Sequence, residues 1–327
     1  MSQRSAQAEA RPRTSRSATV TPIEPPLLVA RAEDLAWSDS AQVVVVGWGA
    51  AGACAALQAR QEGASVLVID RFEGGGASAL SGGVVYAGGG TPQQKEAGFV
   101  DSPQFMHAYL RHEVGQVVSD ATLERFCHDS VANQRWLESH GVRFGATMPD
   151  HKTSYPPEGK FLYYSGNEMV PAYGQHLPPG QKPAPRGHRV VAQGQSGATF
   201  FAALQKATLQ VGAQTLLQAS VRRLVCEQNA DGSPGRVLGV EVWHMPAGDA
   251  RTAQHARLHE DYRRHRTFRA GKAMACLNEA ARLEREAAQP RLVRALQGVV
   301  LSTGGYIFNP ELIAQHAPHT RKGWPIG

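Results

Sequence analysis

Cysteine is scarce and scattered in this chain, and its distribution excludes two kinds of site. The four cysteines, Cys54, Cys127, Cys226 and Cys276, include no Cys-x-x-Cys pair. This spacing fits neither a disulfide framework nor a zinc site built from clustered thiolates. We therefore expect small buried thiols in a reducing compartment, a cytoplasmic location and no metal site.

Long apolar runs are also missing, because no stretch approaches the ~20 apolar residues that a membrane-spanning helix needs.

Acids are nearly absent from the first 26 residues, where only Glu9 and Glu24 occur. Such a segment buries too little surface to offset the entropy of ordering it. Residues 1–38 are predicted to be a disordered tail, with an Arg- and Ser-rich organelle transit peptide as the less favoured alternative.

The net charge of +6 is confined to one segment. Residues 251–296 hold 11 Lys and Arg against 5 Asp and Glu, which accounts for the whole excess. This composition predicts a charged helical insertion, broken at Gly271 and Pro290, rather than a nucleic-acid-binding protein. His255 and His259 have the spacing of two metal ligands on a helix, but no third ligand accompanies them. A solvated helical pair is favoured, and binding to anionic lipid or nucleic acid stays open.

One stretch, residues 43–90, is far more specific than the composition. Four valines lead into Gly47-x-Gly49-x-x-Gly52, which opens an alanine-rich helix. This spacing is typical of a dinucleotide-binding turn: the first glycine permits the turn, the second admits a diphosphate, and the third lets helix and strand pack closely. The helix N-terminus would offer free N–H groups and a positive dipole end to the phosphates.

The sequence SVLVID predicts a second buried parallel strand that ends in Asp70. Asp70 follows Gly47 by 23 residues. This is near the ~20-residue offset of the acid that bonds a ribose hydroxyl. A carboxylate at this position repels a 2′-phosphate, so NADP is disfavoured.

Glycine is unusually dense beyond this strand. From Gly47 through Gly90 there are 12 glycines in 44 residues, against an average usage of ~7%. Such glycines permit positive φ and a close approach to a ligand. A nicotinamide-binding fold does not ordinarily need this second set, whereas a cofactor longer than one βαβ unit does. The glycines therefore indicate FAD.

The rest of the chain predicts further elements. Ser102-Pro103 and Ser119-Asp120 are typical helix starts. Residues 148–189 form an irregular Pro- and Tyr-rich excursion, whose Tyr155 and Tyr164 are candidates to face an apolar substrate; a covering loop without that role is at least as well supported.

Residues 197–213 predict a helix, followed by a strand within TLLQASVRRLV. The segments LVCEQ, ADGSPG and RVLGVEVW predict a β-hairpin, and GVVLSTGGY a buried strand running into paired glycines.

Together, VVVVGWGAAG and GGGASALSGGVVYAGGGT resemble the FAD-dependent fumarate reductase/succinate dehydrogenase flavoprotein superfamily, nearest to its 3-ketosteroid dehydrogenase branch. The resemblance implies an α/β, Rossmann-like FAD-binding domain of the glutathione-reductase type, with a parallel sheet and a β-hairpin or meander excursion. The resemblance implies that the pyrophosphate is contacted by Gly47, Gly49, Ala50, Ala51 and Gly52, the ribose by Asp70, and the adenine by the backbone of Val221. It implies that the ribityl and isoalloxazine end is contacted by Arg71, Ala77, Ser78, Ser81, Gly82 and Gly83. Thr303 and Gly304 are implied to lie where the chain passes the FAD.

Relatives with covalent flavin carry a histidine in the serine and glycine loop. Residues 77–83 are ASALSGG, without histidine, so the resemblance implies non-covalent FAD. It also implies that residues 39–305 are the FAD-binding domain and that residues 306–327 begin a truncated substrate or cap domain. Because the superfamily's catalytic residues lie mostly beyond that point, the catalytic acid and base stay unassigned.

The implied activity is that of an FAD-dependent oxidoreductase that forms a C=C bond in a ketosteroid-like apolar substrate and passes electrons to an external acceptor. Three alternatives stay open: a fumarate-reductase-like enzyme, an FAD-binding fragment without activity of its own, and a plain NAD-dependent dehydrogenase. The tyrosine- and proline-rich excursion favours an apolar substrate over a dicarboxylate.

Overall fold

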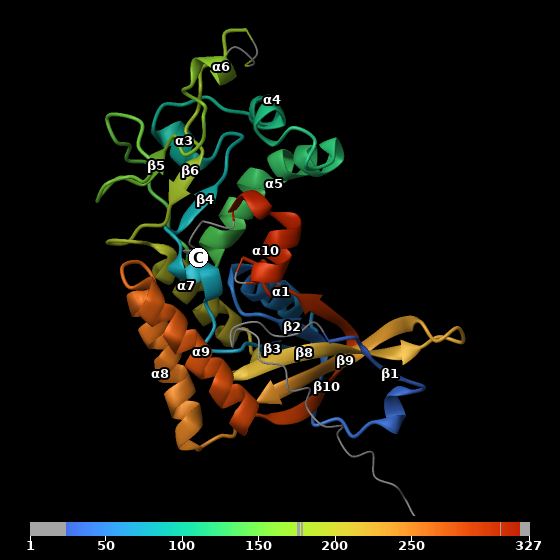
Figure 1. Cartoon of the computed structure of the whole chain (residues 1–327). Helices are drawn as coiled ribbons and strands as arrows, with labels where there is room; N and C mark the ends of the chain where they lie inside the picture. The colour runs from blue at the N-terminus through green and yellow to red at the C-terminus, as the bar shows by residue number, and fades with distance from the viewer. Residues whose placement is uncertain (1–23, 175–176, 178, 308, 321–327) are drawn as a thin grey trace, which may run out of the picture. The chain divides into compact units, whose positions relative to one another are not determined.

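The computed structural model describes residues 24–174, 177, 179–307 and 309–320 (Figure 1). The chain divides into two compact units. The larger unit comprises Pro26–Val242 and Arg291–Gly304, and the smaller unit is made mainly of Trp243–Pro290 and the described residues of Gly305–Ile326. Most of the predicted N-terminal tail, residues 1–23, lies outside the described residues.

A seven-stranded, mainly parallel sheet forms the centre of the larger unit (Figure 1). The prediction of an α/β fold with a parallel sheet is confirmed. In order across the sheet, the strands are β1 (Leu27–Val29), β8 (Ala219–Gln228), β9 (Pro234–His244), β10 (Gln289–Leu301), β2 (Asp39–Val46), β3 (Val66–Ile69) and β7 (Gln214–Leu216).

The predicted run of valines becomes β2, which lies between β10 and β3 and is parallel to both. Successive side chains of a strand point to opposite faces of the sheet. Val45 accordingly packs with the helices α1 (Ala50–Gln61) and α7 (Gly197–Gln210). Val44 and Val46 pack on the other face with residues of β8, β9 and β10. A strand buried on both faces needs a continuous apolar sequence, which β2 has.

The hairpin prediction is confirmed by β8 and β9, which are neighbours in the sheet. The Asn229 N–H donates to the Ser233 carbonyl at 2.9 Å and closes the turn between them. The ion pair of Arg223 with Glu241, at 2.8 Å, links the two strands.

Part of the predicted disordered tail is ordered, and this part of the prediction was wrong. β1 pairs in parallel with β8, with Leu27 opposite Val225. A short 3-10 helix, η1 (Ala32–Asp34), follows it, and the Trp37 indole N–H donates to the Ala32 carbonyl at 2.7 Å. The apolar side chains of this segment pack against β8, which compensates for the entropy of ordering it.

The larger unit also contains a three-stranded antiparallel sheet, with the order β4-β6-β5. Residues 148–189 were predicted to be irregular, yet β5, α6 and β6 lie within them. The elements of this region are β4 (Val84–Tyr86), β5 (Leu162–Tyr163), β6 (Gly187–Arg189), α2 (Gly76–Leu80), α3 (Pro92–Glu96), α4 (Pro103–Val114), α5 (Asp120–Ser139) and α6 (Pro171–Gly174).

The two predicted helix starts are confirmed. Ser102 caps α4 by accepting a hydrogen bond from the Phe105 N–H, and Ser119 caps α5 by accepting one from the Thr122 N–H. The two helices pack on each other through a cluster that includes Leu110.

In the smaller unit, α8 (Ala250–His265) and α9 (Ala270–Ala287) form a helical hairpin, and α10 (Pro310–His316) and η2 (Pro318–Thr320) follow near the C-terminus. The helical insertion predicted for residues 251–296 ends too late, because β10 already begins at Gln289. The predicted break at Gly271 is also wrong, since that glycine lies in the first turn of α9. The end of β10, predicted to be buried, is open to solvent at Leu301, which is 60% exposed.

His255 and His259, the pair with metal-ligand spacing, have other contacts. The His255 Nε2 lies 2.8 Å from a carboxylate oxygen of Glu284, and both side chains are buried. His259 stacks on Tyr262. Among the described residues, no three His, Cys, Asp or Glu side chains gather as metal ligands would. No helix in the described ranges has the length and apolar character to cross a membrane.

His188 is a completely buried titratable side chain of β6. Its Nδ1 lies 3.1 Å from the Arg186 carbonyl oxygen, so Nδ1 carries a proton. Its Nε2 lies 2.9 Å from the Thr91 hydroxyl and accepts from it. Burial opposes the charged form and lowers the pKa of His188 to about 4.

The buried His188 predicts a loss of stability in mild acid. Its pKa is depressed in the folded chain, so between pH 6.5 and about 4 only the unfolded chain takes up the proton. The free energy of unfolding should be fully maintained above pH 6.5 and fall by up to about 3 kcal/mol as the pH approaches 4. Urea unfolding at a series of pH values should show a flatter pH dependence in His188→Gln. The exposed His151→Gln is the control, and a wild-type slope in His188→Gln would contradict the assignment.

Candidate cofactor-binding site

Of the three glycines of the dinucleotide-binding turn (Gly47, Gly49 and Gly52), two are required by contacts within the protein. Gly47 has φ +94°, and a Cβ there would lie 2.5 Å from the Ser302 carbonyl oxygen. A Cβ on Gly52 would lie 2.0 Å from the Gly47 carbonyl oxygen. Both distances are far inside van der Waals contact, so no side chain fits at either position. Packing within the protein therefore accounts for both glycines.

Gly49 differs, because the protein leaves space around it. A Cβ on Gly49 would come no closer than 3.4 Å to any atom, the Ser78 Oγ being nearest. Gly49 is the N-cap of α1, with an extended conformation. In the described part of the chain, the N–H groups of Gly49, Ala51 and Gly52 donate to no protein acceptor.

These free donors make the N-terminus of α1 suitable for an anion. The first N–H groups of a helix lack acceptors within the helix, and the helix dipole places positive charge there. A diphosphate would accept from such donors and occupy the space beside Gly49. The site thus fits the diphosphate of a dinucleotide.

The glycine-rich loop of residues 74–83 lies against this turn. The Gly75 N–H donates to the Trp48 carbonyl at 2.7 Å. The Ser78 Oγ accepts from the Ala50 N–H at 3.0 Å. Ser78 thereby holds α2 beside the first turn of α1, and Ala77, on α2, is exposed.

Ser81, Gly82 and Gly83 continue from α2 towards β4. The Ser81 hydroxyl donates to the Ser78 carbonyl at 2.8 Å and accepts from the Gly83 N–H at 3.1 Å. A Cβ on Gly83 would lie 2.5 Å from the backbone of Ser196. Packing against the start of α7 therefore explains Gly83.

Asp70 lies on the other side of the turn. One carboxylate oxygen accepts from the Trp48 N–H at 2.7 Å, and the other accepts from the Phe72 N–H at 2.9 Å. The Ala219 N–H donates to the Asp70 carbonyl at 2.9 Å. The start of β8 is therefore adjacent to Asp70, and Val221 lies two residues further along that strand. Arg71, the next residue, places its guanidinium 5.0 Å from the Phe72 ring centroid.

Ser302, at the end of β10, is a residue that the sequence interpretation missed. Its hydroxyl lies 2.9 Å from each of the Val46 and Gly47 carbonyl oxygens. The Thr303 Cα lies 3.2 Å from the position of a Cβ on Gly47, and Gly304 has φ +79° with open space around it. The only sequence signal was a hydroxyl residue directly before Thr303 and Gly304.

Trp48, which lies between Gly47 and Gly49, was also missed by the sequence interpretation. It is 1% exposed and meets Phe201 of α7 edge to face, with 5.9 Å between ring centroids. A Cβ on Gly74 would lie 2.9 Å from its ring, so Trp48 explains that glycine. The buried indole N–H has no hydrogen-bond partner among the described residues.

The two predicted substrate tyrosines have bonded hydroxyls. The Tyr155 hydroxyl donates to the Gly82 carbonyl at 2.8 Å, and a Cβ on Gly82 would lie 2.6 Å from the Tyr155 ring. The Tyr164 hydroxyl lies 3.3 Å from the Pro183 carbonyl, and its ring meets Phe99 edge to face. Tyr155 thus lies against the predicted flavin loop, whereas the contacts of Tyr164 are within and beside the excursion.

Arg189 fixes the segment that carries Tyr155. Its side chain is wholly buried, donates to the carbonyls of Pro157 and Gly194 at 3.0 and 2.6 Å, and lies 5.0 Å from the Tyr155 ring centroid. This one guanidinium joins residues 155–158 to residues 192–196. Because so many of its donors are used internally, Arg189 is unsuited to binding a substrate carboxylate.

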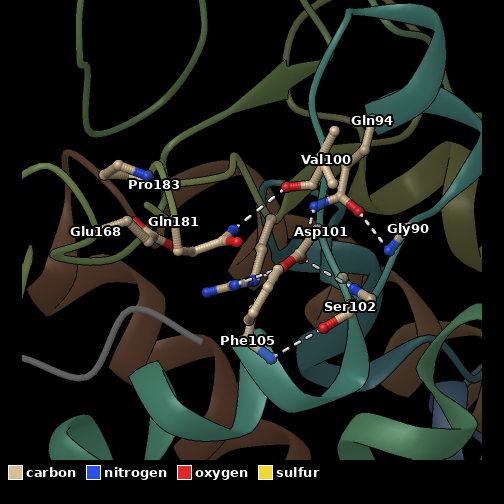
Figure 2. Close-up of polar contacts among 12 residues, drawn as sticks. Gly90, Gln94, Val100, Asp101, Ser102, Phe105, Glu168, Gln181 and Pro183 are labelled. Atoms are coloured by element: carbon tan, nitrogen blue, oxygen red, sulfur yellow. Dashed lines mark hydrogen bonds and ion pairs between the residues drawn. The ribbon is translucent and has the colours of Figure 1, made fainter. Parts of the chain in front are cut away.

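A buried polar cluster centred on Asp101 holds the third glycine run, residues 88–90 (Figure 2). The Gly89 N–H donates to Asp101 at 2.9 Å, and the Gly90 N–H donates to the Gln94 side-chain oxygen at 3.0 Å. A Cβ on Gly88 would lie 2.8 Å from both Asp101 and Arg186. This glycine run was expected to approach a ligand, but contacts within the protein already explain it.

Arg186 and Asp101 form a bidentate ion pair at 2.9 and 2.8 Å, with both side chains almost completely buried. Burial alone would raise the pKa of Asp101, but the hydrogen bonds and charge of Arg186 outweigh it, so the pKa is lowered. Nearby, burial raises the pKa of Glu168, whose carboxylate accepts from the Gly166 N–H at 3.0 Å.

A family model described as an FAD binding domain matches residues 42–327. A 3-oxo-5-alpha-steroid 4-dehydrogenase of Comamonas testosteroni is 58% identical over 246 residues, which make up 74% of this chain and 44% of that protein. A 3-oxosteroid 1-dehydrogenase of Mycolicibacterium smegmatis is 25% identical over 334 residues, with coverages of 87% and 50%. The chain thus spans about half the length of the curated relatives it matches.

Two solved structures are also similar to this chain over most of its length. The 3-ketosteroid-Δ4-(5α)-dehydrogenase of Rhodococcus jostii RHA1, in complex with 4-androstene-3,17-dione, has a TM-score of 0.71 at 29% identity, covering 90% of this chain and 51% of that one. A flavocytochrome c3 fumarate reductase in an open conformation has a TM-score of 0.58 at 25% identity, covering 89% and 38%.

A pair of glycine substitutions separates ligand binding from folding. Gly52→Ala should destabilise the apoprotein by several kcal/mol, because its Cβ overlaps the Gly47 carbonyl. Gly49→Ala should cost the apoprotein only about 1 kcal/mol, the penalty of alanine at an N-cap, while weakening FAD binding at least tenfold. Thermal unfolding and flavin fluorescence titration measure the two effects. Unchanged FAD affinity in Gly49→Ala would contradict a diphosphate beside that residue.

The Asp101 pair makes a separate prediction about stability. Asp101→Asn leaves the buried Arg186 charge without its partner and should lower the free energy of unfolding by about 3–5 kcal/mol. Glu227→Gln, which removes the exposed pair with Arg236, should cost less than about 1 kcal/mol. Denaturant unfolding of both variants provides the comparison, and equal costs would be inconsistent with a buried pair.

Proposed function

Since the chain belongs to the FAD binding domain family, with FAD as its cofactor, we propose that it forms the flavin-holding part of an FAD-dependent 3-oxosteroid dehydrogenase. The proposed reaction removes a hydride and a proton from adjacent carbons and leaves a C=C bond conjugated to the ketone. The main support is the 58% identity to a 3-oxo-5-alpha-steroid 4-dehydrogenase. The likeness to a 3-ketosteroid-Δ4-(5α)-dehydrogenase structure points to the same substrate class.

We propose that residues 39–305 hold the cofactor through the residues predicted from the sequence. In this proposal the N–H groups of Gly49, Ala51 and Gly52 bind the diphosphate, and Asp70 binds the ribose from the adjacent strand. FAD, when bound, supplies the hydride acceptor. The chain's own contribution is to position the cofactor and to exclude water from its reacting end.

In this proposal, the excursion (residues 148–189) excludes water from the reacting end of the flavin. Tyr155 covers Gly82, and the buried Arg189 fixes the backbone on either side of it. An amphipathic tyrosine there can present an apolar ring to a steroid while its hydroxyl stays bonded to the loop. The proton acceptor stays unassigned.

The other parts of the proposal concern the cofactor linkage, the location and the acceptor. FAD is non-covalent, because residues 77–83 carry no histidine to link it. We propose a cytoplasmic location, which is supported by four cysteines that form no disulfide. We also propose that the reduced flavin passes its electrons to an external acceptor.

A fumarate-reductase-like activity is the alternative, favoured by the second structural likeness. A dicarboxylate needs cationic side chains in its pocket. The two arginines of the excursion, Arg186 and Arg189, are already bonded to Asp101 and to backbone carbonyls. These contacts favour the apolar substrate.

Steroid oxidation by the complete protein tests the proposal. With 5α-androstane-3,17-dione and an artificial dye as acceptor, we expect steroid-dependent dye reduction and the ultraviolet absorption of a conjugated enone. Acid precipitation should release the flavin into the supernatant. A flavin-loaded protein that oxidises no 3-oxosteroid but reduces fumarate with a low-potential dye would refute the steroid assignment in favour of the alternative.

A further inference from the structure

The turn of the helical hairpin concentrates positive charge. Residues 263–272, RRHRTFRAGK, contain five Arg and Lys and no acid. On either side, residues 249–262 and 273–288 each contain two arginines against three acids. The basic excess of this part of the chain is therefore confined to its tip, which we call the Phe268 tip (residues 263–272).

Phe268 is the exposed apolar residue at this turn. The helix α8 ends at His265 and α9 begins at Ala270, and the two helices lie side by side (Figure 1). Phe268, in the connection between them, is 92% exposed. The hairpin packs through other residues, including the buried Tyr262 and Ala273. Holding α8 and α9 together therefore does not explain an aromatic residue at the tip.

The charges around Phe268 are only partly neutralised. Arg264 pairs with Asp261 at 3.3 Å, one turn back along α8. Arg269 and Lys272 are exposed, and neither has an ion pair within the described ranges. Burial lowers the pKa of His265, and the charges of Lys272 and Arg269 lower it further. The tip thus presents a positive potential around one large apolar group.

We propose that the Phe268 tip docks onto an anionic phospholipid surface. Phe268 enters the interface between headgroups and acyl chains, where aromatic rings are favourably placed. Arg264, Arg269 and Lys272 bind the lipid phosphates, because basic residues close to an anionic leaflet are attracted to it. The protein is thereby held at the membrane surface through a short contact rather than a spanning segment.

The arrangement favours lipid over nucleic acid. A nucleic-acid site follows a phosphate backbone with basic residues spread along a groove or a helix face. Here residues 249–262 and 273–288, on either side of the tip, each have more acids than Arg and Lys, and the basic residues of the tip lie around one turn. An exposed apolar group at the centre of a basic cluster suits a surface with an apolar interior.

Vesicle co-sedimentation of the 327-residue chain tests this docking. The probes are vesicles of phosphatidylcholine alone and of phosphatidylcholine mixed with phosphatidylglycerol. We expect binding to the anionic vesicles only, weakening as salt is raised. Far-UV circular dichroism of each variant verifies that it is folded.

Two variants separate the apolar and the ionic contributions. Phe268→Ser should weaken vesicle binding roughly tenfold, the scale of one exposed aromatic residue entering the interface. Its control is Val117→Ser, since Val117 is an apolar residue in the larger unit that is 88% exposed. The triple variant Arg264→Ser, Arg269→Ser and Lys272→Ser should weaken binding about 100-fold. Its control is the triple variant Arg31→Ser, Arg125→Ser and Arg236→Ser, which loses the same charge from exposed sites in the larger unit.

Three results would overturn the proposal. The first is a folded protein that does not bind anionic vesicles. The second is vesicle binding that each control variant reduces as much as its tip counterpart does. The third is saturable binding to a single-stranded oligonucleotide that the tip variants abolish while vesicle binding stays at the background level.

Discussion

The close approach of three backbone segments determines the geometry of the site. The end of β2, the first turn of α1 and the end of β10 meet at Gly47, where a single added carbon would overlap the Ser302 carbonyl. The Ser302 hydroxyl, placed between the Val46 and Gly47 carbonyls, joins β10 to the turn. Beside this contact, the N–H groups of Gly49, Ala51 and Gly52 have no protein acceptor among the described residues, whereas the Ala50 N–H donates to Ser78. The anion site is therefore a consequence of how the strands and helix pack.

The glycines of this region have two different physical roles. Gly52, Gly83 and Gly88 are required because another part of the protein occupies the position of a side chain. Gly76 has open space instead, and a Cβ on Gly49 would make only ordinary van der Waals contact. Composition alone cannot separate these roles, since the residue is glycine in both cases. Most glycines of the runs at residues 74–76, 82–83 and 88–90 are explained by contacts within the protein, such as the Asp101 cluster for Gly88.

Local signals in the sequence predicted the elements that local interactions determine. The glycine turn, the strand ending in Asp70 and the helix caps Ser102 and Ser119 all depend on residues within a few positions of one another. β1 was missed because it depends on pairing with Val225, far along the chain. Asp101 and Arg186 are separated by 85 residues, and no periodicity links them. Ser302 was missed for the same reason, because its role appears only when β10 lies beside β2.

The affinity of the apoprotein for FAD relative to riboflavin tests the central claim most directly. If the N–H groups at the start of α1 bind the diphosphate, three hydrogen bonds to charged oxygens are lost with riboflavin. At about 1.5 kcal/mol or more for each bond, FAD should bind at least ~1,000-fold more tightly than riboflavin. Equal affinities for the two flavins would contradict the assignment of α1 as the cofactor's principal anchor.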